Sequence, residues 1–195
     1  PDLGIDINIL KIEEAIDYLI LGKGECVAMS YRLDHSALEF LPLASGELYC
    51  IVPQGHELAG RKQMSAAEMT GYPLIGIDPN DPYGRIMAEI FARNKLSYNI
   101  SIKARFGTTV CALVKAGLGI AVIDQFTVAH GGYPGIELIK IAEPTRFDTY
   151  IAVKRGTPLS LYAEHFIDCL RAEMRALEPG RRQVAKPVKA ATGKK

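Results

Sequence analysis

Two sets of polar residues in this sequence stand where a small charged molecule could bind. Thr108 and Thr109 lie at the predicted entrance of a helix, where free backbone N–H groups and the helix dipole favour an anion. Asp78 directly follows a short apolar run, residues 73–77, which is typical of a buried strand. A carboxylate there could receive an ammonium or guanidinium group while the threonines receive a carboxylate. Together the two sets suggest an amino-acid-like ligand.

A second carboxylate, Asp81, follows closely on Asp78 and leaves two interpretations open. The pair could perform acid–base chemistry. Alternatively, Asp81 caps a helix that begins at Pro82, because aspartate suits the N-cap and proline suits the first helical position. We expect the capping role for Asp81 and keep Asp78 as the carboxylate available to a ligand.

Residues that could support covalent or redox chemistry lack the spacing that such chemistry needs. The sequence contains neither a Gly-x-Ser-x-Gly motif nor a phosphate-binding loop, and Gly117 and Gly119 come after a helix and before a strand, the reverse of a dinucleotide fingerprint. The histidines are scattered: His35, His56, His130 and His165. The cysteines are also far apart, in apolar surroundings typical of buried free thiols: Cys26, Cys50, Cys111 and Cys169. We therefore expect no catalytic residue, no metal site and no cofactor.

The stretch at residues 110–124 organises the rest of the chain. Apolar residues recur at helical spacing up to Gly117, which is suited to the left-handed conformation that ends a helix. The run after Gly119 is too short for a helix and too apolar for a loop, so it predicts a strand covered on both faces and ending at Asp124. A helix entrance beside the end of a buried strand is a place to hold a small polar molecule.

Strand–helix–strand patterns recur on either side of Pro53. Residues 5–10 alternate as a strand, residues 11–21 form an amphipathic helix, and residues 26–29 form a second strand, which we expect to be parallel to the first. Ser30 and Tyr31 fall just past that second strand, where open α/β sheets bind ligands. The same order returns in a strand at 73–77, a helix from Pro82 to about residue 94, and a strand at 98–106.

The remaining segments complete two lobes. Strands are predicted at 38–43, 47–52, 136–141 and 149–153, and Ser65 with Glu68 forms a capping-box pattern for a short helix. A final helix begins near Thr157, and its expected apolar stripe faces a sheet: Tyr162, Phe166, Leu170 and Met174.

Charge is unevenly distributed along the 195 residues, whose formal net charge is +1. The residues after Glu178 include six basic and no acidic side chains, so the rest of the chain carries a net charge of −5. An acidic body is not a nucleic-acid-binding surface by itself, and residues 179–195 are expected to form a basic disordered tail. No apolar run approaches the ~20 residues of a membrane span. Because the chain starts at Pro1 in strand-like residues, we expect it to be a fragment.

Three motifs in order, LYCIVPQGHELA, YPLIGI and TTVCALVKAGLGIAVID, make residues 1–175 resemble the effector-binding domain of LysR-type transcriptional regulators. The resemblance implies an α/β fold of two Rossmann-like lobes joined by two crossover strands, like periplasmic binding proteins. It also implies that a small inducer binds between the lobes, and that an N-terminal winged helix-turn-helix and the first strand of the first lobe are missing here.

Carried over from this family, the effector contacts fall on both lobes: Ser30, Tyr31, Asp78, Thr108, Thr109 and Asp124. Two departures stand out. KGECVAMS replaces the family's usual run before Ser30, and Asp124 stands where many members have proline, so its side chain could contact a ligand or form a hinge bond. The IDPNDPYGR segment is similar to that of members sensing opines or basic amino acids.

We therefore predict the ligand-sensing domain of a cytoplasmic transcriptional regulator that binds an amino-acid-like or opine-like inducer. Lobe I is assigned to residues 1–52 with 149–178, lobe II to 53–148, and the tail to 179–195. The expected partners are the inducer, DNA through the missing helix-turn-helix, and further copies in a homodimer or homotetramer, but no membrane. The alternatives are a periplasmic solute-binding protein for amino acids and a cleft enzyme using Asp78 or Asp124 as a base.

Overall fold

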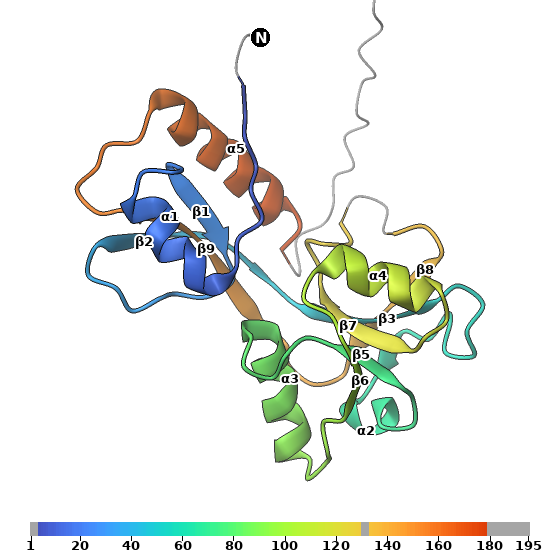
Figure 1. Cartoon of the computed structure of the whole chain (residues 1–195). Helices are drawn as coiled ribbons and strands as arrows, with labels where there is room; N and C mark the ends of the chain where they lie inside the picture. Colours follow the sequence, from blue (N-terminus) through green and yellow to red (C-terminus); the bar gives the residue numbers. More distant parts are fainter. Residues whose placement is uncertain (1–3, 130–132, 179–195) are drawn as a thin grey trace, which may run out of the picture.

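The chain is arranged around two separate β-sheets (Figure 1). The computed structural model describes residues 4–129 and 133–178, so His130 and the predicted tail at 179–195 lie outside the described residues. Each sheet carries helices on both faces, and the α/β fold of two lobes predicted from the sequence is confirmed.

Lobe I contains a three-stranded sheet in the order β1-β9-β2. Its strands are Cys26–Met29 (β1), Leu38–Gly46 (β2) and Phe147–Lys154 (β9), and both pairings are antiparallel. Alternate residues of β9 serve opposite faces: Ile151 packs beneath helix α5 (Leu161–Ala176), and Ala152 packs beneath α1 (Ala15–Ile20). The lobe is therefore a sheet between two helices.

Lobe II contains a six-stranded sheet in the order β4-β8-β3-β7-β5-β6. Its strands are Leu48–Pro53 (β3), Gln63–Met64 (β4), Leu74–Gly76 (β5), Ile100–Lys103 (β6), Ile120–Asp124 (β7) and Ile136–Ile141 (β8). Helices α2 (Ala66–Met69) and α3 (Pro82–Arg93) cover one face, and α4 (Gly107–Lys115) covers the other. Strand β7 is buried between them, as the sequence predicted.

The chain passes between the two sheets twice, once between Gly46 and Leu48 and once between Ile141 and Phe147. Strand β3 pairs with β7 and β8, so the strand predicted at 47–52 lies in the lobe II sheet and not in lobe I. Likewise, β9 begins at Phe147 and not at residue 149. The change of lobe is predicted at Pro53 because proline ends a strand. In the structure the chain instead leaves the lobe I sheet at Gly46 and enters the lobe II sheet at Leu48.

The strand predicted at 5–10 does not form. Ile5, Ile7 and Ile9 alternate as expected, yet Ile7 and Ile9 are each 79% exposed. A strand needs a hydrogen-bonding neighbour, and among the described residues β1 pairs with β9 alone. The expected parallel strand–helix–strand unit is therefore wrong for the described chain, and its helix is reduced to the 3₁₀ turn Ile12–Glu14 followed by α1.

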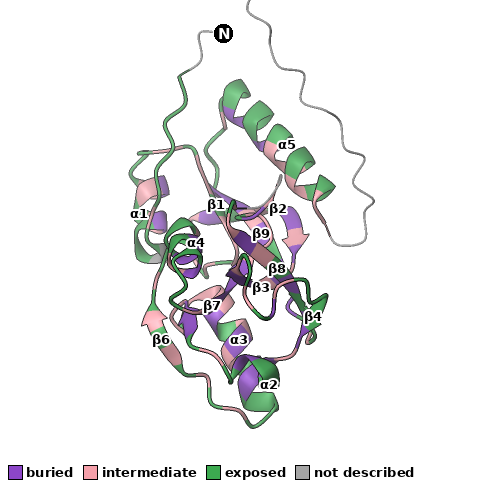
Figure 2. Ribbon diagram, turned by 90° about the vertical axis from the view of Figure 1, so that its right-hand side faces the viewer, coloured by how far each residue is buried: buried purple, intermediate pink, exposed green. Residues whose placement is uncertain are grey.

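Helix α5 begins later and faces the sheet differently from the prediction. Ser160 is its N-cap, with its hydroxyl accepting a hydrogen bond from the Ala163 N–H at 3.1 Å. Leu170 and Met174 pack on the lobe I core as predicted, with Ile167 fully buried, whereas Tyr162 is 67% exposed. Figure 2 shows most of α5 exposed, with its buried residues along one side. The predicted stripe is displaced because its two aromatic members, Tyr162 and Phe166, are exposed, while Ile167 is buried.

The end of α4 has the geometry that the sequence predicted. Gly117 has φ +77°, its N–H bonds the Val114 carbonyl at 2.8 Å, and the Leu118 N–H bonds the Leu113 carbonyl at 3.2 Å. These two bonds form a Schellman motif. Gly119 follows with φ +151°, in close contact with the backbone carbonyl of Pro73.

These two glycines should differ in their response to alanine. A Cβ at Gly119 would lie 2.3 Å from the Pro73 oxygen, whereas one at Gly117 would meet open space. We expect Gly119→Ala to reduce the free energy of unfolding by about 3 kcal/mol and Gly117→Ala by about 1 kcal/mol, the cost of the left-handed conformation alone. Urea unfolding measures both, and equal losses would contradict the close approach at Gly119.

Candidate functional site

A cavity of about 1020 Å³ runs from lobe I into the junction between the lobes. Its first part lies within lobe I, between residues 4–11, β1 and α5. Its second part is lined by residues from both lobes: Ser30, Tyr31, Asp81, Tyr83, Gly107 and Asp124. We call this second part the inter-lobe pocket. A concave site with several polar groups is the usual form of a small-molecule site.

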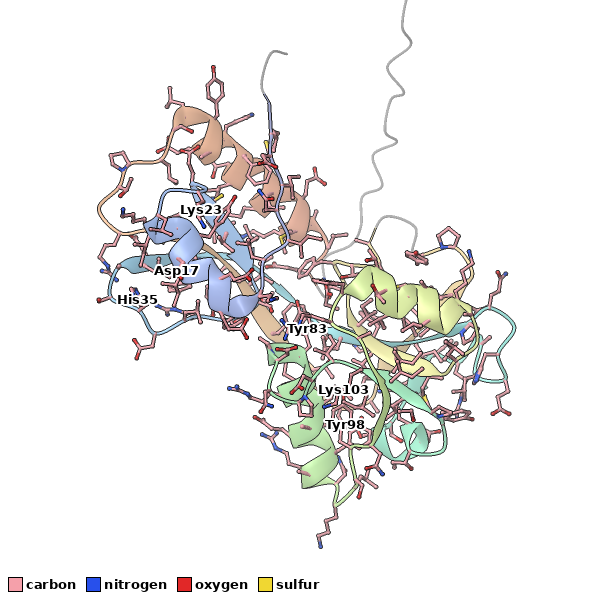
Figure 3. All side chains as sticks on the ribbon, viewed as in Figure 1. Asp17, Lys23, His35, Tyr83, Tyr98 and Lys103 are labelled. Carbon is pink, nitrogen blue, oxygen red and sulfur yellow. The ribbon has the colours of Figure 1, made fainter. Side chains whose placement is uncertain are left out.

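Tyr83, which the sequence analysis missed, occupies the junction itself (Figure 3). It lies in the first turn of α3, and its ring packs against Phe147 at the start of β9, with ring centroids 4.8 Å apart. Burial raises the pKa of Tyr83, the Asp124 carboxylate adds to that effect, and a hydrogen bond with the Ser30 side chain opposes it. Tyr83 therefore connects lobe II to the end of the lobe I sheet where β1 finishes and β9 begins.

Tyr31 has a buried hydroxyl oxygen that lacks a hydrogen-bond partner among the described residues. Burial, followed by the charges of Glu13 and Asp81, raises the pKa of Tyr31 to about 12. Glu13 belongs to the 3₁₀ turn of lobe I and Asp81 to the start of α3 in lobe II. Two carboxylates on different lobes thus act on one buried, unpartnered hydroxyl.

Asp78 and Asp81 have roles that differ from the prediction. Asp78 accepts hydrogen bonds from the backbone and side-chain nitrogens of Asn80, each at 2.9 Å, and forms an ion pair with Lys103 at 3.6 Å. The Asn80 N–H, assisted by the Lys103 charge, lowers the pKa of Asp78, which does not line the pocket. Asp81 occupies the N-cap position before Pro82, but its side chain makes no capping bond and lines the pocket instead.

Thr108 and Thr109 lie in the first turn of α4, as predicted, but both are exposed. The cavity reaches this helix through Phe106, Gly107 and Val110. The N-cap residue is Phe106, whose side chain cannot cap, so the free N–H groups of the first turn have no side-chain partner at that position. The structure therefore places the threonines beside the pocket rather than in its lining.

Asp124 lines the pocket and also holds the turn after β7. Its Oδ1 accepts hydrogen bonds from the N–H groups of Phe126 and Thr127, both at 3.0 Å, and its Oδ2 accepts one from the Thr127 hydroxyl at 2.6 Å. Of the two roles considered for Asp124, a bond within the turn is thus observed in the structure.

Arg105, which the sequence analysis did not consider, lies at the opening of the pocket just before α4. A second, smaller cavity brings it together with Glu13 across the two lobes. Among the described residues the Arg105 guanidinium makes neither a hydrogen bond nor an ion pair, whereas Lys11 nearby is paired with Glu14 at 3.7 Å. An unpaired charged side chain at a pocket entrance is a candidate ligand contact, and it can be recognised only once the fold is known.

The remaining chemistry-bearing residues do not gather into a site. Within the described ranges, no group of three or more histidine, cysteine or acidic residues could hold a metal ion. Cys50 and Cys111 are buried as expected, and burial raises the pKa of Cys50 to about 12, but Cys169 is exposed on α5. No described helix combines the length and the apolar character needed to cross a membrane.

The hydrogen bonds of Asp124 predict a measurable structural role. Asp124→Ala should lower the free energy of unfolding by about 2 kcal/mol, because two backbone N–H groups and one hydroxyl lose their acceptor. Thr127→Val removes the hydroxyl alone and should cost less. Urea unfolding of both variants provides the comparison, and an Asp124→Ala protein as stable as the wild type would refute the role.

Tyr31 should behave in the opposite way. Tyr31→Phe removes a buried hydroxyl that has no partner among the described residues, so we expect unligated stability to be unchanged or to rise by up to about 1 kcal/mol. Thermal and urea unfolding measure this. A loss above about 1 kcal/mol would mean that the hydroxyl is satisfied in the folded protein.

Comparison with known proteins agrees with this two-lobe arrangement. Residues 1–175 match the family described as the LysR substrate binding domain. The chain is 26% identical over 179 residues to the HTH-type transcriptional activator CmpR of Synechocystis sp., covering 91% of this chain and 59% of that protein. It spans about half the length of the curated relatives that it matches first.

Solved structures share the fold at lower identity. HinK, a LysR family transcriptional regulator from Pseudomonas aeruginosa, aligns with a TM-score of 0.72 and 24% identity over 85% of this chain and 57% of that one. The Synechocystis PCC6803 CcmR regulatory domain, solved in complex with 2-PG, aligns with a TM-score of 0.68 and 18% identity over 85% and 81%. With a family match across nearly all of its described length, the chain belongs to the LysR substrate-binding domain family, a ligand-sensing regulatory domain rather than an enzyme.

Proposed function

We propose that this chain is the effector-sensing part of a LysR-type transcriptional regulator and binds a small amino-acid-like or opine-like inducer in the inter-lobe pocket. The observation that carries the proposal is a pocket lined by polar groups of both lobes, including Tyr31, whose hydroxyl has no hydrogen-bond partner among the described residues. The CcmR regulatory domain was solved with a small molecule, 2-PG, which supports effector binding by this fold.

The proposed effector contacts are centred on Ser30, Tyr31 and Asp124, with Asp81 and Tyr83 added from the geometry. Thr108 and Thr109 are retained as contacts in a closed form, because they directly follow Gly107, which lines the pocket. Asp78 is proposed to act indirectly, since its bonds to Asn80 fix the loop that ends at Asp81.

Signalling is proposed to occur by a shift in the relative angle of the lobes. The two crossings are joined by Thr145, whose Oγ1 bridges the N–H and carbonyl of Leu48. Beside them, within the lobe I sheet, Thr149 Oγ1 bridges the N–H and carbonyl of Ala44. These short connections permit rotation while each lobe stays intact. An effector that binds one angle more tightly shifts the population toward it, and only that difference in affinity can drive the switch.

The first part of the cavity is proposed to hold a β-strand of lobe I rather than the effector. The outer edge of β1 has no partner among the described residues, and the exposed isoleucines of 5–10 alternate as a strand would. A strand between β1 and residues 5–10 would pair with both of them.

The lobe boundaries are proposed from the two sheets. Lobe I comprises the residues up to 46 with 147–178, and lobe II comprises the residues from 47 to 146.

The other partners are also proposals. The curated relatives extend well beyond the matched region, and the HTH-type activator CmpR is named for a helix-turn-helix, so DNA binding is assigned to a winged helix-turn-helix outside this chain. Paired DNA half-sites favour a homodimer or homotetramer. A cytoplasmic location follows from that role. The family match favours this regulator over a periplasmic solute-binding protein.

A thermal-shift screen tests the ligand class. The full-length regulator is heated with basic amino acids, opines, dicarboxylic acids and neutral sugars. A true effector at 100 times its dissociation constant should stabilise the protein by about 2.7 kcal/mol, which raises the melting temperature by several degrees.

The control is Tyr31→Phe, which should keep or raise the unligated melting temperature while reducing the ligand-induced shift. If dicarboxylic acids or sugars raise the melting temperature and no zwitterionic compound does, the proposed ligand class is wrong. The assignment to the family would not change.

A further inference from the structure

Two side chains of opposite charge, one from each lobe, line the smaller cavity at the junction of the lobes. Glu13 belongs to the 3₁₀ turn of lobe I, and Arg105 directly precedes the start of α4 in lobe II. The rest of the lining consists of Lys11, Glu14 and Phe106. Among the described residues neither Glu13 nor Arg105 takes part in an ion pair or a side-chain hydrogen bond. Two complementary charges therefore stand on opposite lobes of one cavity without being joined.

The turn that carries Glu13 is held by its neighbours and not by Glu13 itself. The Glu14 N–H bonds the Lys11 carbonyl at 3.0 Å, and the Glu14 carboxylate accepts the Lys11 N–H at 3.3 Å. The same carboxylate pairs with the Lys11 ammonium at 3.7 Å, which balances one positive and one negative charge of the cavity. The Glu13 carboxylate takes no part in these contacts, so it is available to a partner outside the turn.

Arg105 is positioned on lobe II by the residues on either side of it. The Ala104 N–H bonds the Gly76 carbonyl at 3.0 Å, which continues the pairing of β6 with β5, and Phe106 is the extended N-cap of α4. The backbone of Arg105 is thus fixed between a strand and a helix, while its side chain is exposed. A guanidinium keeps its charge at every physiological pH and matches the geometry of a carboxylate.

We propose, on the basis of the function proposed above, that Glu13 and Arg105 form an ion pair between the lobes in the closed form and act as a latch on the inter-lobe pocket. In the structure the two groups share a cavity without bonding, and a rotation that narrows this cavity brings them into contact. Because the pair then exists in the closed form alone, it stabilises that form relative to the open one. A difference of this kind is what shifts a population of conformations.

The latch is connected to the effector site through Arg105, which lines the larger cavity as well as the smaller one. Both partners are exposed, so the pair has the modest strength of a surface ion pair and should change the ratio of closed to open forms by up to about fivefold. The apparent affinity for an effector follows the fraction of the protein in the form that binds it. The latch should therefore be measurable both as closure and as affinity.

The first experiment measures closure without an effector. Ser36→Cys in lobe I and Ala67→Cys in lobe II, both exposed and outside the two cavities, carry spin labels, and the exposed Cys169 is replaced by serine. Pulsed electron paramagnetic resonance on the full-length regulator, diluted with unlabelled protein, gives the distribution of distances within one chain.

Reversing one charge should open the latch, and exchanging both charges should restore it. Glu13→Arg places two positive groups across the cavity and should change the ratio of the closed to the open component by about fivefold or more. Glu13→Arg with Arg105→Glu should return the distribution to that of wild type. High salt should shift the wild type in the same direction as Glu13→Arg.

The second experiment measures affinity by isothermal titration, with the compound that gives the largest thermal shift on the wild type. Glu13→Arg and Arg105→Glu should each weaken binding about 5- to 20-fold, and the double variant should recover to within about twofold of wild type. If Arg105 instead binds the effector directly, the double variant will bind as weakly as Arg105→Glu alone, which overturns the latch.

The matched control is Glu89→Arg, which makes the same change of net charge at an exposed position. Glu89 is paired with Arg93 at 3.3 Å within lobe II and lines neither cavity. The ratio of closed to open components and the affinity should both stay within about twofold of wild type.

Two results would overturn the inference. One is a distance distribution that is the same in wild type and Glu13→Arg, and the other is a double variant that keeps the defect of the single variants. Failure of the proposed function gives a different result, in which no amino-acid-like or opine-like compound binds the wild type while the spin-label distances still respond to the exchange of charges.

Discussion

The two places where the chain crosses from one sheet to the other constrain everything else in this molecule. At the crossings the buried hydroxyl of Thr145 bonds the N–H and carbonyl of Leu48. Beside them the buried hydroxyl of Thr149 bonds those of Ala44, where the pairing of β2 with β9 shifts register. Gly46 completes the arrangement, because a Cβ there would lie 2.6 Å from the ring of Phe147. That space lets Phe147 pack between Tyr83 and Phe126 at the lobe junction. The position of the pocket therefore depends on a few small and aromatic residues at the crossings.

Most of lobe II could be predicted from the sequence because its signals are local. The helix stop at Gly117, the capping box of Ser65 with Glu68 and the buried run of β7 each depend on neighbouring residues, and all three are confirmed. Lobe I was predicted less well because its strands depend on partners far away in the chain. Residues 5–10 have the alternation of a strand, but pattern alone cannot supply the neighbour that a strand needs.

The candidate site shows the same limit at the level of single side chains. Ser30, Tyr31 and Asp124 line the cavity, as their positions at strand ends suggested. The exchange of roles between Asp78 and Asp81 could not be foreseen, because both suit a turn before a helix and only the packing of Gly84 decides which one is held locally. Tyr83 lies in the IDPNDPYGR segment, but none of the effector contacts carried over from the family falls on it, and Arg105 belongs to none of the quoted motifs. Both line the cavity only because the two lobes come together in the folded chain.

The end of α5 has a consequence for how this domain could report its state. The helix packs on lobe I, yet the carbonyl of Leu177 at its end accepts a hydrogen bond from Gln125 of lobe II at 2.7 Å, and Gln125 also receives the Glu47 N–H at 2.8 Å. Glu178 meanwhile bonds the Ser45 N–H at 3.1 Å. The last turn of the helix is thus fastened to both bodies at the pivot. If the lobes change their relative angle as proposed, these hydrogen bonds must lengthen or exchange partners, so the residues that end α5 would respond directly to that change.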